Sequence, residues 1–170
     1  MYRRQRYHEF EAFLNWLEAT IIEQEIDVLL VAGDVFDNTT PGTQSQSLYY
    51  SFLHRVRQSG CRHVVITSGN HDSPSFLDAP RDFLHFFDVQ VVGRATDDPA
   101  DEVLVLEAAT GEPELIVCAV PFLRDRDVRI SAAGETADEK ERSVVDGIHA
   151  HYAAVTAEAV RRREALGVDV

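Results

Sequence analysis

The chain has 170 residues, of which 45% are hydrophobic, so it is long and apolar enough to form one folded domain or most of one. Its formal net charge of −13 argues against simple electrostatic binding to nucleic acid, unless bound divalent cations supply positive charge at a site. No apolar run reaches the ~20 residues that a membrane-spanning helix needs, so we expect no membrane partner and a cytoplasmic location.

The first half of the chain alternates amphipathic segments with short apolar runs. Apolar side chains recur at helical spacing over residues 7–25 and again over residues 41–58. Residues 26–32 (IDVLLVA) and 63–67 (HVVIT) are continuous apolar runs rich in β-formers, which is typical of strands buried on both faces of a parallel sheet.

A further helix is predicted over residues 75–87 and a short strand over residues 89–92. The turn residues Thr110-Gly111-Glu112 then predict a hairpin between strands at 103–106 and 115–120.

Residues 124–135 are polar and predict a loop. A long helix is expected from about residue 137 to 165, ended by Gly167, and residues 168–170 resemble the start of another strand. The inner stripe of the long helix is predicted to comprise Val144, Ile148, Tyr152, Val155 and Val160. Helices and strands in this order predict a layered α/β fold, with a sheet flanked by helices.

Polar residues follow both apolar strands directly. Residues 33–37 read Gly-Asp-Val-Phe-Asp, and residues 69–72 read Gly-Asn-His-Asp. Glycine allows a tight turn at a strand end, and ligands of open α/β sheets bind at the carboxyl ends of the strands. The two turns are therefore expected to point their polar side chains into one crevice.

These residue types suit a site for hard metal ions. Asp34 offers two carboxylate oxygens that can bridge two cations, Asn70 offers an amide oxygen, and His71 can ligate or transfer a proton near neutral pH. Mixed oxygen and nitrogen ligands suit Mn²⁺, Fe²⁺ or Zn²⁺. Taken singly, each residue is more simply explained as a turn, a cap or an ordinary surface residue, but turn chemistry does not readily produce the combined pattern.

The sequence at these positions resembles a known family. VAGDVFD at 31–37 and SGNHDS at 68–73 are similar to two signature blocks of the calcineurin-like metallophosphoesterases. The opening YRRQRYHEFEAFLNWL, the IDVLL strand and VPFLRDRD at 120–127 more specifically resemble the SbcD-type DNA exonuclease subunit of the bacterial SbcC–SbcD complex.

The resemblance implies roles for individual residues. Asp34 corresponds to a carboxylate that bridges both metals, and Asn70 to a ligand of one metal. His71 corresponds to the acid that protonates the leaving oxygen or to a residue that steadies the transition state. Asp37 corresponds to the partner of that histidine, whereas Asp72 is expected to be structural. The family further implies a phosphodiesterase with two Mn²⁺ ions that processes DNA ends together with an SbcC-like ATPase.

Other family blocks have no counterpart here. An Asp-x-His block is expected just before residue 1, and a single His and then a Gly-His-x-His block after residue 170. His149 and His151 fall within a helix and are interpreted as ordinary helix-surface histidines. The chain is therefore expected to be one partial domain over residues 1–170, incomplete at both ends, marginally stable, and weak or inactive alone.

Two alternatives stay open. The chain is also compatible with a phosphoesterase acting on nucleotides or other small phosphoesters. A non-catalytic dimerisation module is the other alternative. A homodimer through helices 41–58 and 75–87 is expected, and the competing interpretation is that these amphipathic helices bury their apolar side chains against the sheet. In the homodimer, the apolar residues of those helices would face a partner instead of the sheet: Leu48, Tyr49, Phe52, Phe76, Leu77 and Phe83.

Overall fold

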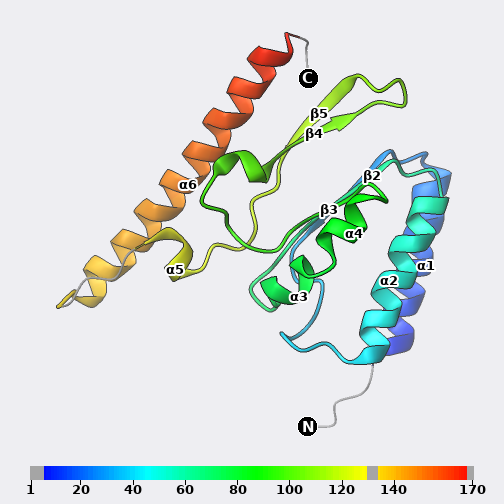
Figure 1. The fold of residues 1–170 in the computed structure, drawn as a ribbon. Coiled ribbons are helices and arrows are strands. Elements are labelled where there is room, and N and C mark those ends of the chain that lie inside the picture. The colour runs from blue at the N-terminus through cyan, green and yellow to red at the C-terminus, as the bar shows by residue number, and fades with distance from the viewer. Residues whose placement is uncertain (1–5, 130–133, 168–170) are drawn as a thin grey trace.

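Two amphipathic helices form the first layer of the fold. The computed structural model describes residues 6–129 and 134–167, and in it α1 (Tyr7–Glu23) packs beside α2 (Thr43–Gln58) (Figure 1). An ion pair between Arg55 Nε and Glu18 Oε2, 2.6 Å long, joins the two helices. Both helices agree with the sequence prediction apart from their terminal residues.

The helices cover one face of a parallel sheet whose order is β1-β2-β3. Its strands are β1 (Val28–Ala32), β2 (His63–Thr67) and β3 (Val89–Val92). Since all strands run the same way and Ala32 pairs with Thr67, the turns after β1 and β2 emerge at the same edge. The predicted parallel sheet is confirmed.

Strand β1 is less buried than its apolar sequence predicts. Its side chains alternate between the two faces, and Leu30 is 56% exposed on the face away from α1 and α2. The neighbouring strand has the expected burial, with Val65 on that face only 3% exposed. The prediction of burial on both faces is therefore wrong for β1, because β1 is the edge strand and no described segment covers Leu30.

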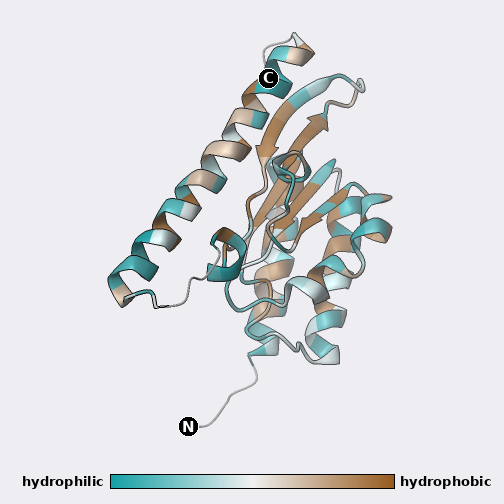
Figure 2. Cartoon of the chain, turned by 60° about the vertical axis from the view of Figure 1, so that its left-hand side comes forward, coloured by the Kyte–Doolittle hydropathy of each residue, from teal (hydrophilic) through white to brown (hydrophobic). Residues whose placement is uncertain are grey.

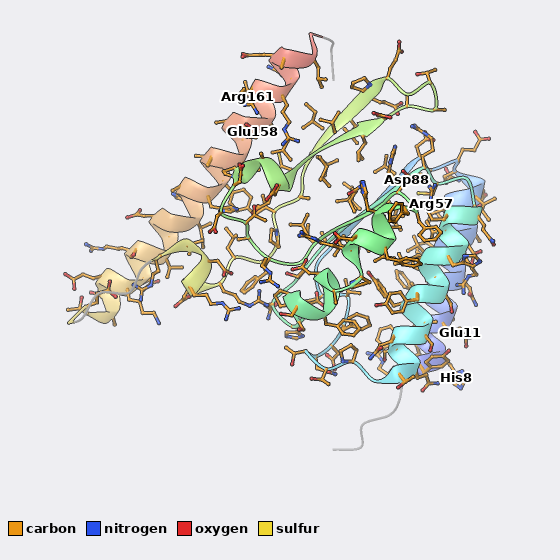
Figure 3. All side chains as sticks on the ribbon, in the orientation of Figure 1. His8, Glu11, Arg57, Asp88, Glu158 and Arg161 are labelled. Atoms are coloured by element: carbon orange, nitrogen blue, oxygen red, sulfur yellow. The ribbon has the colours of Figure 1, made fainter. Side chains whose placement is uncertain are left out.

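The predicted helix over residues 75–87 is broken into α3 (Pro74–Asp78) and α4 (Arg81–His85). Pro80 accounts for the break, because proline has no N–H and its ring clashes with the carbonyl of the preceding helical turn. The two pieces pack against β3. At the end of α4, Asp88 Oδ2 accepts a 2.9 Å hydrogen bond from Arg57 Nη2 of α2 (Figure 3).

A hairpin covers part of the second face of the sheet. It comprises β4 (Val103–Glu107) and β5 (Pro113–Cys118), preceded by the short 3-10 helix η1 (Pro99–Glu102). Leu106 and Ala119 pack against Val65 and Val92 of the sheet. The apolar strands of hairpin and sheet face one another in Figure 2. The predicted hairpin is confirmed, with its second strand beginning and ending earlier than expected.

The chain ends in α6 (Ala137–Leu166), a long helix that lies along the hairpin and η1 (Figure 1). The side chains of Thr136 and Glu139 cap its first turn, and Gly167 (φ 64°) ends it. Only Val155 of the predicted inner stripe is buried, and Tyr152 is 50% exposed, because the helix contacts the body along one side only.

The predicted loop 124–135 contains a short helix, α5 (Asp125–Val128). The strand expected at 168–170 lies outside the described residues. The fold class is confirmed as α/β, with helices flanking a parallel sheet. Among the described helices, none is both long and apolar enough to cross a bilayer.

Candidate active site

The turn after β1 brings Asp34 towards the turn after β2. Gly33 has φ 80° and Asp34 has φ 48°, so the chain takes two consecutive left-handed steps. A non-glycine residue in this conformation costs about 1–3 kcal/mol and must be held by its surroundings. The Asp34 carboxylate supplies one such restraint, because its Oδ1 accepts a 3.2 Å hydrogen bond from the amide of His71.

Gly69 is required for this approach of the two turns. A Cβ atom at position 69 would lie 2.1 Å from Asp34 Oδ1 and 2.3 Å from the Asp34 amide nitrogen. A Cβ at Gly33 would lie 2.9 Å from the Cα of Gly69. Both glycines thus allow the turns to pack backbone to backbone, with the Asp34 carboxylate in the space that a side chain at 69 would fill.

Asp72 holds the two turns together from inside. Its carboxylate is fully buried. It accepts hydrogen bonds from the amides of Phe36 (2.8 Å), Gly69 (2.8 Å) and Val35 (3.1 Å). The expected structural role of Asp72 fits this geometry, because one carboxylate satisfies backbone donors from both turns.

The segment that leaves β5 crosses the same turn. The amide of Phe122 donates to the carbonyl of Ser68 at 2.8 Å, and Arg124 Nη2 donates to the carbonyl of Asp72 at 3.2 Å. The Arg124 guanidinium also lies 5.7 Å from the centre of the Phe122 ring. Arg124 lies within the VPFLRDRD block that carries the resemblance, and charge patterning alone indicates a solvated surface residue there.

The predicted site residues lie on the exposed side of these turns. Asp34, Asp37, Asn70 and His71 are all exposed, whereas Asp72 is buried and Arg124 is partly buried. Asp34 and His71 are brought together, and Asn70 precedes His71 in the same turn. In the described part of the chain no hydrogen bond or ion pair joins Asp37 to His71, so the role of Asp37 stays a prediction.

The donor set fits part of a site for hard divalent cations. The Asp34 carboxylate and the Asn70 amide provide oxygen ligands at adjacent strand ends. Within residues 6–129 and 134–167, no group of three or more His, Cys, Asp and Glu side chains is placed to hold a metal ion. The described residues therefore supply some of the ligands that two cations would need, and not all of them.

The two histidines of α6 lie elsewhere. His149 is exposed, in agreement with the sequence prediction. His151 differs from it, because its side chain is only 12% exposed and its Nε2 lies 2.8 Å from Oε2 of the fully buried Glu102. Its interpretation as an ordinary surface histidine is wrong. His151 fastens α6 to η1.

An apolar cavity of about 550 Å³ adjoins the first turn. It lies between α1, α2 and the sheet, and its lining includes Gly33, Asp34 and Asp37. The other lining residues are mainly apolar, so the cavity offers little that would bind a phosphate. The polar lining is concentrated at the end next to the first turn, where Asp34 and Asp37 belong both to the cavity wall and to the candidate site.

Comparison with known proteins agrees with this geometry. A family model described as calcineurin-like phosphoesterase matches residues 5–130, which include both turns and the segment after β5. The chain belongs to this family.

Among curated proteins, this phosphoesterase is similar to the SbcD subunit of the nuclease SbcCD from several bacteria. It is 36% identical to the Escherichia coli protein over 162 residues, which cover 95% of this chain and 39% of that relative. It is 34% identical to the Rhodobacter capsulatus protein over 167 residues, covering 95% of this chain and 40% of the relative. The Bacillus subtilis protein is 31% identical over 96 residues, which cover 56% of this chain and 25% of that relative. The chain thus spans about two fifths of the length of the Escherichia coli and Rhodobacter capsulatus relatives.

Proposed function

We propose that this phosphoesterase is part of a metal-dependent DNA exonuclease subunit that hydrolyses phosphodiester bonds. The hydrogen bond between Asp34 Oδ1 and the His71 amide is the observation that carries the proposal, because it unites the candidate metal ligand and the candidate acid in one exposed unit. The similarity to the SbcD subunit of the nuclease SbcCD supports DNA as the substrate.

In the proposed site, the Asp34 carboxylate and the Asn70 amide oxygen would hold the divalent cations. We propose Mn²⁺ as the physiological ion, since carboxylate and amide oxygens suit it. Bound cations neutralise the phosphate and lower the pKa of a metal-bound water. Asp34 Oδ1 accepts a hydrogen bond from the His71 amide. The other lone pairs of Oδ1 and those of Oδ2 are available to bind cations.

His71 is proposed to donate a proton to the leaving oxygen. Its imidazole is exposed, so a bound phosphoester can reach it, while its backbone is fixed to Asp34. Asp37 is proposed to orient this imidazole, since both residues lie on the exposed turns at the same sheet edge. A positioned acid of this kind contributes typically about 10²–10⁴-fold to the rate.

The partners proposed for the protein are DNA and an SbcC-like ATPase. Residues 1–170 are proposed to form part of one nuclease domain, since the relatives are more than twice as long as the aligned region. With a formal net charge of −13, the chain depends on its cations to attract phosphate. We place the activity in DNA repair and recombination in the cytoplasm.

A second copy of the chain is a further proposed partner. Tyr49, Phe52 and Leu77 of the predicted dimer helices are buried in the core, so they are not free to bind it. The end of α4 differs, because Phe86 is 84% exposed and Phe83 is 65% exposed. We propose that these two side chains contact the partner. Sedimentation analysis of Phe86→Asp tests this: a dimer that survives the substitution would contradict the proposal.

Hydrolysis of an end-labelled DNA duplex in Mn²⁺ tests the enzymatic proposal. The chain is assayed alone and with its ATPase partner, beside Asp34→Ala and the exposed control Asp82→Asn, which has no role in the site. We expect any cleavage to be lost in Asp34→Ala only. Cleavage that survives Asp34→Ala would contradict the proposed site. Turnover of a small phosphoester without cleavage of DNA would favour the nucleotide phosphoesterase.

A further inference from the structure

Arg124 and Phe122, in the segment after β5, contact the turn that contains Asn70 and His71. Arg124 Nη2 donates to the carbonyl of Asp72, and the nearby Phe122 amide donates to the carbonyl of Ser68. These hydrogen bonds lie at the two ends of turn 69–72. The segment 119–124 therefore holds this turn from outside the parallel sheet.

The carboxylates near Arg124 in the sequence form their ion pairs with other residues. Asp127 accepts the backbone amide of Arg124 and pairs with Arg126. Asp125 pairs with Lys140. In the described part of the chain, no carboxylate forms an ion pair with the Arg124 guanidinium. The guanidinium instead contacts the backbone of a residue whose own carboxylate is fully buried.

Among the described residues, the Asp72 carboxylate is held by backbone donors. It is surrounded by the three backbone amides of Val35, Phe36 and Gly69, and no described arginine, lysine or histidine forms an ion pair with it. Burying a carboxylate is costly unless hydrogen bonds and nearby positive charge compensate for the loss of water. A second nitrogen of Arg124, Nη1, is buried with no described partner, so this side chain carries an energetic cost of its own.

We propose that Arg124 is a positioning residue for Asn70 and His71. It fixes turn 69–72 through the carbonyl of Asp72, the residue whose buried carboxylate anchors both turns. Loss of Arg124 lets the turn open, which separates the His71 amide from Asp34 Oδ1 and displaces Asn70. The functional reason for holding this turn in place rests on the proposed nuclease function. The positioning by Arg124 itself requires neither metal nor DNA.

Amide hydrogen exchange of the metal-free chain, followed by NMR, tests this role. Arg124→Met removes both the donor and the charge, Arg124→Lys keeps a donor and the charge, and Arg126→Met is the matched control at a side chain 77% exposed. We expect Arg124→Met to speed exchange of the Gly69 and His71 amides about tenfold, since one hydrogen bond and its charge are lost. The Val65 amide of β2 should be unchanged, and Arg124→Lys should restore most of the protection.

Three results would overturn the proposal. Unchanged exchange rates of the Gly69 and His71 amides in Arg124→Met would show that the turn keeps its conformation without Arg124. Equal acceleration at Val65 would show a general loss of stability rather than a local role. The same acceleration in Arg126→Met would assign the effect to the segment and not to Arg124. None of these results depends on nuclease activity, so failure of the nuclease proposal is recognised separately, by the cleavage assay.

Discussion

The amide of His71 donates to Oδ1 of Asp34 across 3.2 Å, which joins two residues that lie 37 positions apart in the sequence. The contact couples the candidate acid to the candidate metal ligand before any cation binds. A cation that binds Asp34 is therefore placed at a fixed position relative to turn 69–72. Substitutions at the residues that hold the two turns and the helix α6 can test how this arrangement is maintained.

Asp72→Asn should destabilise the fold by about 2–4 kcal/mol, because an amide NH₂ would face backbone donors that now bond to a buried carboxylate. Urea unfolding measures the change in the free energy of unfolding. Asp82→Asn is the control, since the Asp82 side chain is 97% exposed. Equal stability of the two variants would contradict the anchoring role of Asp72.

Gly69→Ala should be disruptive, since its Cβ would lie 2.1 Å from Asp34 Oδ1. Forced overpacking costs about 1–3 kcal/mol, and here the relief requires movement of Asp34 itself. We expect lower stability together with weaker Mn²⁺ binding by calorimetry. Gly42→Ala is the matched control, because a Cβ there meets nothing within 4 Å. Wild-type Mn²⁺ binding by Gly69→Ala would count against the close packing of the turns.

His151→Ala should cost about 1–3 kcal/mol, because it leaves Oε2 of the buried Glu102 without its partner. His149→Ala, at an exposed position on the same helix, should change the free energy of unfolding little. Thermal unfolding of the two variants compares them directly. If both lose the same stability, His151 does not fasten α6 to η1.

Glu158 should make the stability of α6 depend on pH at acidic values. Hydrogen bonds from Arg161 and Arg162 lower the pKa of its carboxyl from 4.5 to about 2 (Figure 3). A pKa lowered by folding adds stability that is full above pH 4.5 and is lost as the pH falls through about 2.

The variant Glu158→Gln tests this dependence. Its stability deficit relative to wild type should be constant near neutral pH and should narrow between pH 4.5 and about 2. Glu164→Gln, exposed on the same helix, is the control. A deficit that stays constant down to pH 2 would contradict the assigned pairing.

Much of the parallel sheet could be predicted from the sequence, because its strands are apolar runs with clear turn residues after them. Strands β2 and β3 have the predicted bounds, and the polar residues after β1 and β2 meet as expected. The broken helix at Pro80 was also readable in principle, since proline interrupts a helical pattern at a known place.

The remaining differences depend on contacts between distant parts of the chain. The exposure of Leu30 depends on which segments cover the second face of the sheet, and local sequence does not specify that. The pairing of His151 with Glu102 joins residues 49 positions apart. Arg124 reaches the carbonyl of Asp72 across 52 positions. Periodicity and turn chemistry carry no information about such long-range polar contacts.

The most direct test of the central claim is to locate the residues at which Mn²⁺ binds. Substoichiometric Mn²⁺ added to isotopically labelled protein broadens the NMR signals of nearby amides, so the site is located without any assay of activity. We predict selective broadening of the amides of Gly33, Asp34, Asn70 and His71, and its loss in Asp34→Asn. Broadening centred on the acidic start of α6, or unchanged broadening in Asp34→Asn, would contradict the account.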